Sequence, residues 1–546
     1  MTRLLPSAVL ALAVCALLAP EASAAGKSRS TQGAAEVVLP GDARAAGVRQ
    51  TGRTWIVAGR PGAATRRIVP RFGGRPVIAS AGVYVVPIRR ARAVAAALGH
   101  QLTMAEPDAL ARKRAFPSDP LTPSQWWVPA VVDPSLDPPV VTSSSPVLGV
   151  IEEELDSSHP DTQGMIQEPP PGKPLRPPPD EHGTAVAAVA GAPANGVGTV
   201  GIWPGMRILL PVYNGVACST ITAAVNRAAT AGVRVINMSY GFAASQCRAH
   251  LIATEKAFAQ GIALVAAGGN EFQEGNPGSR PGTDPHVISV AAINRDDSSS
   301  FFSSEHAGID VSAPGTEILT AIPPQFDDDG VRDGFTHIQG TSFSAPIVAA
   351  AVTWLRAVRP DLLAGQVQRM VQLAAIDLAD DAVGRGWDQR YGYGKVNLAR
   401  LLNATTPAPD PLEPNDDAEW VDGRRLRRAA PIFTGRTRVL AARLQQVDDS
   451  LDVYRAVIPR RSTVSFRLFL LAGDADLDVY RAGTRTITLD AGLLGRSRKS
   501  GRRTDVVTIT NRFRHPRTVL VNPYVFSGAP HDAAYRLQIK RVRFRG

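Results

Sequence analysis

Long hydrophobic runs are nearly absent from this sequence of 546 residues. The one clear run, residues 8–19, is too short to cross a membrane as a helix. Arg3 precedes it and Ala22-Ser23-Ala24 follows it, which is the pattern of a secretory signal peptide with a small-residue cleavage site. We therefore expect residues 1–24 to be removed and the remaining chain to be soluble, secreted and without a membrane span.

Cysteine is also scarce, with three residues in the chain. Cys15 falls within the expected signal peptide, so the mature protein can form at most one internal disulfide, between Cys218 and Cys247. Exported proteins meet oxidising conditions in which such a bond persists. We predict this disulfide, and the alternative is a pair of buried thiols.

The net charge of +11 is distributed unevenly along the chain. Residues 25–117 hold 16 Lys and Arg against 4 Asp and Glu, a net charge of +12. Residues 118–404 hold 17 against 29, a net −12, and residues 405–546 hold 26 against 15, a net +11. Opposite fields orient association, so we expect the first segment to dock on the second. The basic residues form no recognised nucleic-acid-binding motif, so no nucleic-acid partner is expected.

The sequence contains no internal repeat, and it is too long for one hydrophobic core, so several domains are expected. Residues 25–53 are rich in Gly and Ala. After them, apolar patterns predict strands at 54–57 and 82–86 and a helix at 91–98. The segment up to residue 117 is therefore predicted to contain a small α+β domain.

Residues 118–404 alternate short apolar strands with helical patterns, which predicts an α/β domain with a parallel sheet flanked by helices. The Pro-rich linker at 405–411 marks the next boundary. Residues 405–546 show alternating strand patterns and no long helical pattern, which predicts an all-β sandwich. The clearest strand patterns of the α/β domain are at 146–151, 233–236 and 262–265.

The chain contains no Gly-x-Ser-x-Gly sequence, which excludes the α/β-hydrolase arrangement as the setting of a catalytic serine. Ser342 instead stands in Gly340-Thr341-Ser342-Phe343-Ser344-Ala345-Pro346, at the start of an apolar helical run. A hydroxyl there lies near free backbone N–H groups, which suits a nucleophile whose attack creates an oxyanion. The same pattern is also common in ordinary helix caps.

Two further short sequences carry side chains with complementary chemistry. His182, in Glu181-His182-Gly183-Thr184, opens an Ala- and Val-rich helix, and its ordinary pKa near neutrality suits a general base. Asn270 follows an apolar strand in Gly268-Gly269-Asn270, where its amide could donate to an oxyanion. Each has an ordinary alternative, a helix cap for the histidine and a turn residue for the asparagine.

Taken together, these three sequences resemble the subtilase family of serine peptidases, and the resemblance covers most of residues 118–404. The spacing also suits that family, with 88 residues from His182 to Asn270 and 72 from there to Ser342. The resemblance implies a serine endopeptidase that cleaves protein or peptide substrates through an acyl-enzyme and needs no cofactor for the reaction. In it Ser342 is the nucleophile, His182 the base and Asn270 the oxyanion donor. Asn237-Met238-Ser239-Tyr240-Gly241 looks like the substrate-binding strand of the family, which implies binding roles for Ser239, Tyr240, Gly241 and Gly268.

The acid of the triad is where the sequence departs from the family pattern. The family has Asp-Thr-Gly after its first strand, and here that position reads Glu152-Glu153-Glu154. Ungapped register makes Glu152 the acid, with Asp156 as the runner-up. Glu154 replaces a glycine where the backbone is expected to turn tightly. A glutamate carboxylate can orient His182, but the alternative is a catalytically inactive subtilase fold kept for binding.

The flanking segments also resemble parts of exported peptidases. Residues 54–117 look like a subtilase propeptide, so residues 25–117 are expected to inhibit the peptidase as part of a zymogen. Residues 405–546 resemble the β-sandwich at the end of many bacterial exported peptidases, on Glu413-Pro414-Asn415-Asp416-Asp417 and 474–480. The carboxylates at 474–478 could bind a structural Ca²⁺ ion, and the alternative is the ordinary acidic start of a strand.

Overall fold

The computed structural model describes residues 36–37, 39, 54–108, 116–167, 178–211, 213, 215–379, 383–410, 412–445, 449–525 and 533–543. The expected signal peptide lies outside these ranges. Internal contacts divide the chain into two units, Met1–Lys113 and Arg114–Gly546, and each is described by itself.

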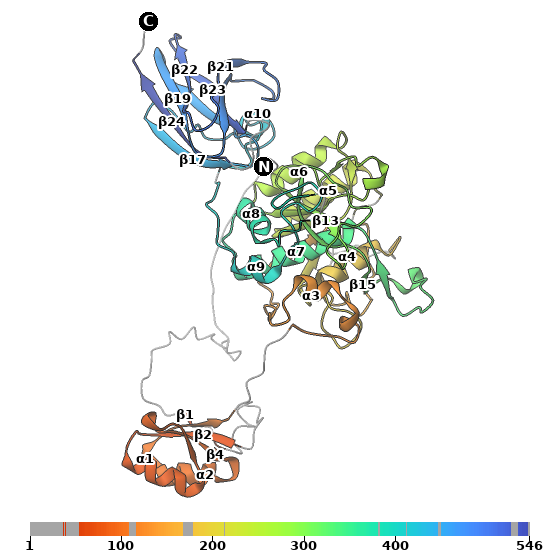
Figure 1. Cartoon of the computed structure of the whole chain (residues 1–546), viewed down its shortest axis with the longest axis vertical. Coiled ribbons are helices and arrows are strands. Elements are labelled where there is room, and N and C mark those ends of the chain that lie inside the picture. Colours follow the sequence, from red (N-terminus) through yellow and green to blue (C-terminus); the bar gives the residue numbers. More distant parts are fainter. Residues whose placement is uncertain are drawn as a thin grey trace, which may run out of the picture. The chain divides into compact units, whose positions relative to one another are not determined.

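The first unit is a sheet with two helices (Figure 1). Its strands run in the order β1 (Glu36–Val37), β5 (Leu102–Pro107), β2 (Thr54–Gly59), β4 (Val83–Pro87) and β3 (Arg75–Ile78). Helix α1 spans Ala63–Ile68 and α2 spans Ile88–Leu98. Helix α2 buries Ala91, Val94 and Leu98, spaced to lie on one helix face, in a core with Trp55 and Val57. The α+β arrangement expected for this segment is confirmed.

A seven-stranded parallel sheet forms the centre of the second unit. Every residue of β9, β11 and β13 is buried, as expected for strands covered on both faces. The strand order is β14 (Ile309–Pro314), β13 (Val287–Ile293), β11 (Ala263–Ala267), β9 (Val235–Met238), β6 (Val147–Val150), β8 (Arg207–Leu209) and β7 (Ile166–Gln167).

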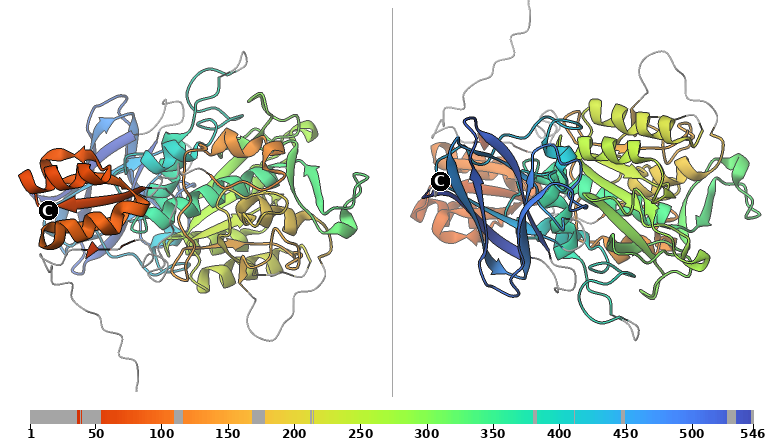
Figure 2. Two further views of the ribbon diagram at one scale, coloured as in Figure 1. Left: turned by 90° about the horizontal axis from the view of Figure 1, so that it is seen from below. Right: turned by 90° about the horizontal axis from the view of Figure 1, so that it is seen from above.

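Helices cover both faces of this sheet (Figure 2). One core joins Val235 and Val265 to α4 (His182–Gly191) and α7 (Thr341–Val358). The opposite core joins Ile236 and Leu264 to α5 (Cys218–Thr230) and α6 (Arg248–Phe258). Successive strand residues point to opposite faces, which is why neighbours in the sequence enter different cores. The other helices are α3 (Trp127–Val131), α8 (Ala364–Ala374) and α9 (Leu398–Asn403).

Helix α7 is the one helix of the described residues that is long and apolar enough to cross a membrane. In this fold it is a core helix, because 83% of it is buried and it packs against β9, β11, β13 and β14. Its amino-terminal end therefore has a fixed place beside the carboxyl ends of the central strands. Two short antiparallel pairs complete this part: β10 (Phe242–Ala243) with β12 (Ser279–Arg280), and β15 (Ile318–Ala321) with β16 (Phe335–Ile338).

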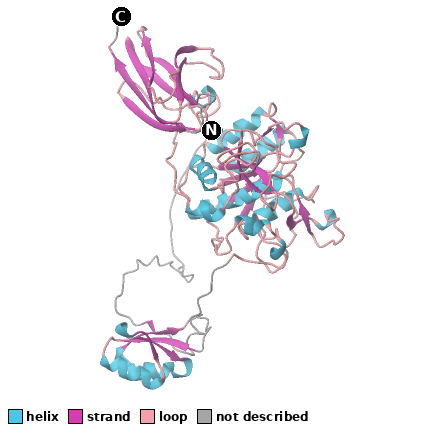
Figure 3. Cartoon of the chain, viewed as in Figure 1, coloured by secondary structure: helices cyan, strands magenta, loops and turns pink. Residues whose placement is uncertain are grey.

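Strands predominate after residue 430 (Figure 3). Two four-stranded antiparallel sheets share one core, in which Phe466, Leu477 and Tyr535 are buried. The predicted all-β sandwich is therefore present, preceded by the short helix α10 (Ala418–Val421). The strand order of the first sheet is β17 (Arg438–Leu444), β24 (Ala533–Val542), β19 (Ser462–Ala472) and β22 (Asp505–Asn511). The strand order of the second sheet is β18 (Tyr454–Ile458), β23 (Arg517–Val525), β20 (Ala475–Arg481) and β21 (Leu493–Ser497).

Candidate active site

Glu152 lies two residues beyond the end of β6, at the carboxyl edge of the parallel sheet. The backbone is fixed on both sides, because Ile151 N–H donates to Asn237 and Tyr213 N–H donates to the Glu152 carbonyl. The side chain is buried, with 6% of its surface exposed, and its Oε2 lies 3.1 Å from Nδ1 of His182. Ligand sites of open α/β sheets occur at this carboxyl edge.

His182 is the first residue of α4, and its backbone N–H donates to Asp180 Oδ1 at 3.0 Å. The next residue explains how the helix comes so close to the acid. A Cβ atom on Gly183 would lie 2.1 Å from the Glu154 carbonyl oxygen, so only glycine fits there. The absent side chain at 183 thus lets the start of α4 pack against the loop that carries Glu152.

The acidic surroundings change the protonation of His182. Burial acts to lower the pKa of the imidazole, but the charge and hydrogen bond of Glu152, with Asp180 and Glu181 in support, raise it to about 9. The Glu152 contact therefore holds the ring in place and also stabilises its protonated form. This is the effect that an acid must have on a histidine base during proton transfer.

Ser342 is the second residue of α7, directly after Gly340 and Thr341. Its Oγ donates to the Ser239 carbonyl at 3.2 Å, and the Ser239 hydroxyl donates to the Ser342 carbonyl at 2.7 Å. The His182 ring lies 5.5 Å from the ring of Phe343, between centroids, so base and hydroxyl occupy the same edge. The hydrogen bond of the Ser342 hydroxyl is therefore to Ser239 in this structure, and catalytic hydrogen bonds often tighten only when a substrate is bound.

Asn270 follows β11, and its amide orientation is determined by its neighbour across the site. Its Oδ1 accepts hydrogen bonds from Thr341 N–H at 2.9 Å and from Thr341 Oγ1 at 2.8 Å. A backbone N–H can only donate, so the oxygen must face Thr341 and the Nδ2 group faces the other way, beside Gly340. Asn270 can therefore present an N–H donor next to Ser342, at the amino-terminal end of a helix.

The residues expected to bind substrate follow the ends of β9 and β11. Ser239 contacts Ser342 directly, as described above, and Gly241 is exposed. The Tyr240 hydroxyl instead bonds His250 Nε2 at 2.8 Å, so its side chain faces the protein. Gly268 packs closely, because a Cβ there would lie 2.7 Å from Ile309, and its carbonyl accepts from His306.

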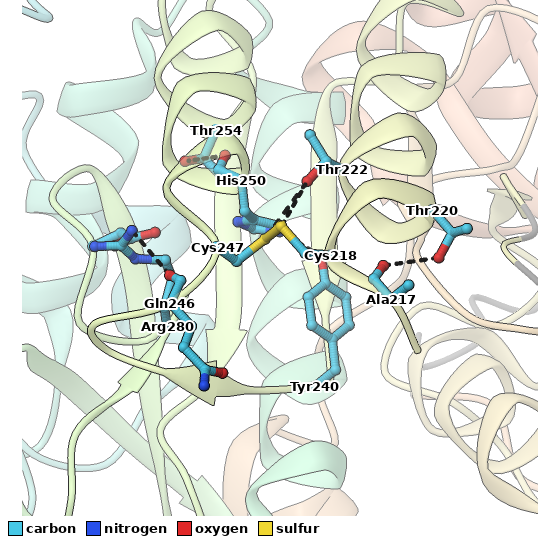
Figure 4. Close-up of a disulfide and its surroundings, with 11 residues drawn as sticks. Ala217, Cys218, Thr220, Thr222, Tyr240, Gln246, Cys247, His250, Thr254 and Arg280 are labelled. Atoms are coloured by element: carbon cyan, nitrogen blue, oxygen red, sulfur yellow. Dashed lines mark hydrogen bonds and ion pairs between the residues drawn. A yellow bond between two sulfur atoms is a disulfide. The ribbon is translucent and has the colours of Figure 1, made fainter. Parts of the chain in front are cut away.

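A disulfide joins Cys218 and Cys247, as predicted (Figure 4). Cys218 begins α5 and Cys247 precedes α6, so the bond ties together the starts of two helices on one face of the sheet. Figure 4 shows Tyr240 and His250 beside it, and Thr222 Oγ1 lies 3.9 and 3.8 Å from the two sulfurs. The bond therefore stands next to the segment that follows β9.

The runner-up acid and the expected tight turn are both among the described residues of the acid segment. The runner-up Asp156 uses its Oδ1 to accept from the N–H and hydroxyl of Ser158, at 2.9 and 2.6 Å, so it holds a local turn. Glu154 is absent from the described non-glycine residues with positive φ, so this backbone needs no glycine. Sequence reasoning also missed Thr341, whose position next to Ser342 was the available signal.

The site lies within the region where the chain is similar to known proteins. A model of the subtilase family matches residues 143–394. Subtilisin DY of Bacillus licheniformis is 32% identical over 223 residues, which cover 40% of this chain and 76% of that relative. A probable subtilase-type serine protease of Deinococcus radiodurans is 31% identical over 245 residues, 41% of this chain and 32% of its own length. The chain thus spans between a third and three-quarters of these relatives.

Similar solved structures include that of fervidolysin from Fervidobacterium pennivorans, described as a keratinolytic enzyme related to subtilisin. It covers 84% of this chain and 85% of its own, with 18% identity and a TM-score of 0.47. The match to a protease of Pseudoalteromonas arctica covers 53% of this chain and 98% of that protease's chain, with 21% identity and a TM-score of 0.45. Because subtilisin DY is matched over 76% of its length at 32% identity, the chain belongs to the subtilase family.

Proposed function

We propose that this chain is a secreted serine endopeptidase, made as a zymogen, with Ser342 as nucleophile, His182 as base and Glu152 as acid. The observation that carries the proposal is the 3.1 Å contact between the buried Glu152 carboxylate and His182 Nδ1. A glutamate in place of aspartate would break the triad if it could not reach the ring. Here it reaches the nitrogen that a triad acid must hold.

In the first half-reaction, Ser342 Oγ attacks the carbonyl carbon of the scissile peptide bond while His182 Nε2 takes the hydroxyl proton. The resulting imidazolium is stabilised by the Glu152 carboxylate through Nδ1–H. His182 then gives the proton to the departing amine, the C–N bond breaks, and the acyl group remains as an ester on Ser342. A water molecule, deprotonated by His182, attacks that ester and releases the acid product.

Negative charge develops on the substrate carbonyl oxygen in both half-reactions. The Asn270 Nδ2 group is directed beside Gly340 and can donate to this oxygen, since its Oδ1 is held by Thr341. Losing one such side-chain donor costs about 3–4 kcal/mol of transition-state stabilisation in serine peptidases. The amino-terminal end of α7 adds a favourable dipole at the same place.

We propose that the substrate is an extended peptide that pairs with the backbone of residues 239–241. Gly241 is exposed, so its backbone groups are accessible, whereas the Tyr240 side chain is occupied by His250. Pairing through the main chain gives affinity without demanding one particular sequence. Side-chain specificity would then come from the surroundings of Gly268 and Asn270.

The Cys218–Cys247 disulfide supports export, because such bonds persist in oxidising compartments. The basic segment 25–117, with its net charge of +12, supports a propeptide that recognises a peptidase segment of net charge −12. No cofactor is needed for this chemistry. The peptidase domain and the segment after residue 404 form the mature protein in this proposal.

The test is labelling of the processed protein with a fluorophosphonate, which reacts with an activated serine and with few other groups. We expect covalent labelling at Ser342 in the wild type and none in Ser342→Ala. A matched control is Ser344→Ala, because Ser344 donates to the Ala313 and Pro314 carbonyls and takes no part in the reaction. An unlabelled wild type, after removal of residues 25–117, would instead support an inactive binding protein.

A further inference from the structure

Where the chain passes from the peptidase domain into the sandwich, buried acidic side chains crowd together. One carboxylate oxygen from each of Asp410, Glu413 and Asp452 lies within 4.8 Å of the others. The charge of Asp449 interacts with all three of these carboxylates. Asp416 and Glu255 lie beside them, and His286 contacts Glu255, Glu413 and Asp416.

His286 lies at the peptidase side of the cluster and contacts three of its carboxylates. Its Nδ1 lies 3.0 Å from Glu255 and 3.5 Å from Asp416, and its Nε2 lies 3.3 Å from Glu413. Both ring nitrogens thus lie beside carboxylate oxygens, those of Glu255 and Asp416 on one side of the ring and that of Glu413 on the other.

The side chain of Asp452 supports a bound cation independently of the number of carboxylates in the cluster. Its side chain is fully buried, and within the described part of the chain its Oδ1 has no hydrogen-bond partner. Its Oδ2 accepts from the Tyr535 hydroxyl, and its backbone carbonyl accepts from Asn522. The Asn415 amide lies close to this carboxylate but donates to Glu413 Oε1 at 2.8 Å. Asp452 therefore holds a buried acceptor oxygen rigidly toward the cluster.

The neighbouring oxygens repeat this pattern. Asp410 Oδ2 and Asp449 Oδ1 are also buried without a hydrogen-bond partner in the described residues. Three unsatisfied carboxylate oxygens in one place are costly unless a cation binds them. They adjoin a cavity of about 320 Å³ lined in part by Asp410, Glu413 and Asp449.

We propose that a Ca²⁺ ion binds among four carboxylates, those of Asp410, Glu413, Asp449 and Asp452. Calcium takes six to eight oxygen ligands at about 2.3–2.6 Å, so two of its ligands lie up to about 5 Å apart. The carboxylate oxygens of Asp410, Glu413 and Asp452 lie within 4.8 Å of one another, which fits that limit. Calcium is favoured over Mg²⁺ because the donors are carboxylates in a loose arrangement, and Mg²⁺ demands a tight octahedron.

The position of this site gives it a role in joining the two domains. Asp410 lies in the linker at 405–411, Glu413 follows two residues after its end, and Asp449 and Asp452 lie in the sandwich. The Glu413 carboxylate contacts both the proposed ion and His286, which lies before β13 of the peptidase sheet and stacks on Phe258 of α6. A bound ion therefore fixes the linker to the sandwich while Glu413 holds the same segment to the peptidase domain.

The sequence also suggested a Ca²⁺ site at residues 474–478, and one carboxylate of that segment provides a matched control. Asp478 is neutralised by Arg496 at 2.7 Å. Asp476 is also buried and has an oxygen without a hydrogen-bond partner in the described residues, but it lies on β20 and that oxygen is 3.9 Å from Arg498. Asp476→Asn thus removes another buried carboxylate of the same sandwich that is not among the four proposed ligands.

The experiment uses the full chain carrying Ser342→Ala, so that self-digestion does not interfere. After removal of metal, Ca²⁺ binding is measured by isothermal titration calorimetry, and the melting temperature is recorded with Ca²⁺ and with a chelator. We expect Asp452→Asn to bind one Ca²⁺ fewer than its parent, and Asp476→Asn to bind the same number. Ca²⁺ should raise the melting temperature of the parent more than that of Asp452→Asn.

With the chelator present, Asp452→Asn should melt at or above the temperature of the parent, because it removes one of several repelling charges. If that variant does not fold, Glu413→Gln must show the same loss of one ion. Unchanged Ca²⁺ stoichiometry in the folded Asp452→Asn and Glu413→Gln variants would overturn the proposal. Loss of the ion in Asp476→Asn alone would move the site to β20.

Discussion

Glutamate is one methylene longer than aspartate, and at position 152 the longer side chain still reaches His182. The Glu152 backbone is held by β9 and by Tyr213, so the side chain itself must span the distance to His182. It does so from a buried position, with Oε2 on the ring and Oε1 without a hydrogen-bond partner in the described residues. One oxygen of the Glu152 carboxylate thus makes the contact with His182. One substitution can therefore remove the charge of this side chain, and another can shorten it.

Glu152→Gln should keep the fold and lower kcat by about ten-thousandfold, because an amide holds the base in the wrong tautomer. Glu152→Asp should be much milder, since it keeps the charge and changes the reach by one methylene. Steady-state kinetics on a peptide substrate measures both. Asp156→Asn is the control and should change kcat little, because that carboxylate serves Ser158. The reverse ranking of these variants would make Asp156 the acid.

The pH profile should reflect the raised pKa of His182, about 9. The base works only when neutral, so kcat/KM should increase with pH and level off above about 9. Burial opposes this shift, whereas Glu152 is the largest contribution that raises the pKa. The midpoint in Glu152→Gln should therefore fall below that of the wild type. An identical midpoint in the residual activity of the variant would show that Glu152 does not act on the ring.

Sequence reasoning placed Glu152, His182, Asn270 and Ser342 at positions that the fold brings to one edge of the sheet. It could not foresee the role of Thr341, because hydrogen bonds between a helix start and a distant strand end depend on tertiary packing. It also expected a glycine-like turn at Glu154, whereas the close approach occurs at Gly183. The sequence alone does not show which backbone group packs against a glycine, because that contact forms only in the folded chain.

At the scale of the elements, apolar strand patterns and helical patterns predicted the parallel sheet and the sandwich well. Strands buried on both faces give continuous apolar runs, as in β9, β11 and β13, and such runs are easy to find. The two-residue strands β7 and β10 are too short to leave a pattern. The cluster around His286 was also missed, because it combines residues that are far apart in the sequence.

The disulfide links the starts of α5 and α6 across 29 residues. A loop of that length stabilises the fold by about 3–4 kcal/mol in the chain-entropy model. In the Ser342→Ala background, a Cys218→Ser/Cys247→Ser variant should therefore melt roughly 5–7 °C lower, as measured by calorimetry. A reductant should lower the melting temperature of the parent and leave the variant unchanged. Equal melting of parent and variant would mean that the bond contributes nothing to stability.

At the scale of the whole molecule, the first unit and the rest of the chain differ in charge and are compact separately. We predict cleavage between about residues 111 and 123, where residues 111–115 lie outside the described ranges. Amino-terminal sequencing should locate a new end there in the wild type and none in pure Ser342→Ala. Identical processing of both proteins would rule out self-cleavage. Cleavage that occurs faster at low salt would support electrostatic docking of the basic segment.

The two hydrogen bonds from Thr341 to Asn270 have a mechanical consequence. Thr341 directly precedes Ser342, the proposed nucleophile, on the same buried helix. The two hydrogen bonds therefore attach Asn270, the proposed oxyanion donor, to the neighbour of Ser342. A small shift of the amino-terminal end of α7 would therefore carry the Asn270 amide along with Ser342. The distance between the proposed oxyanion donor and the proposed nucleophile would be kept during such a shift.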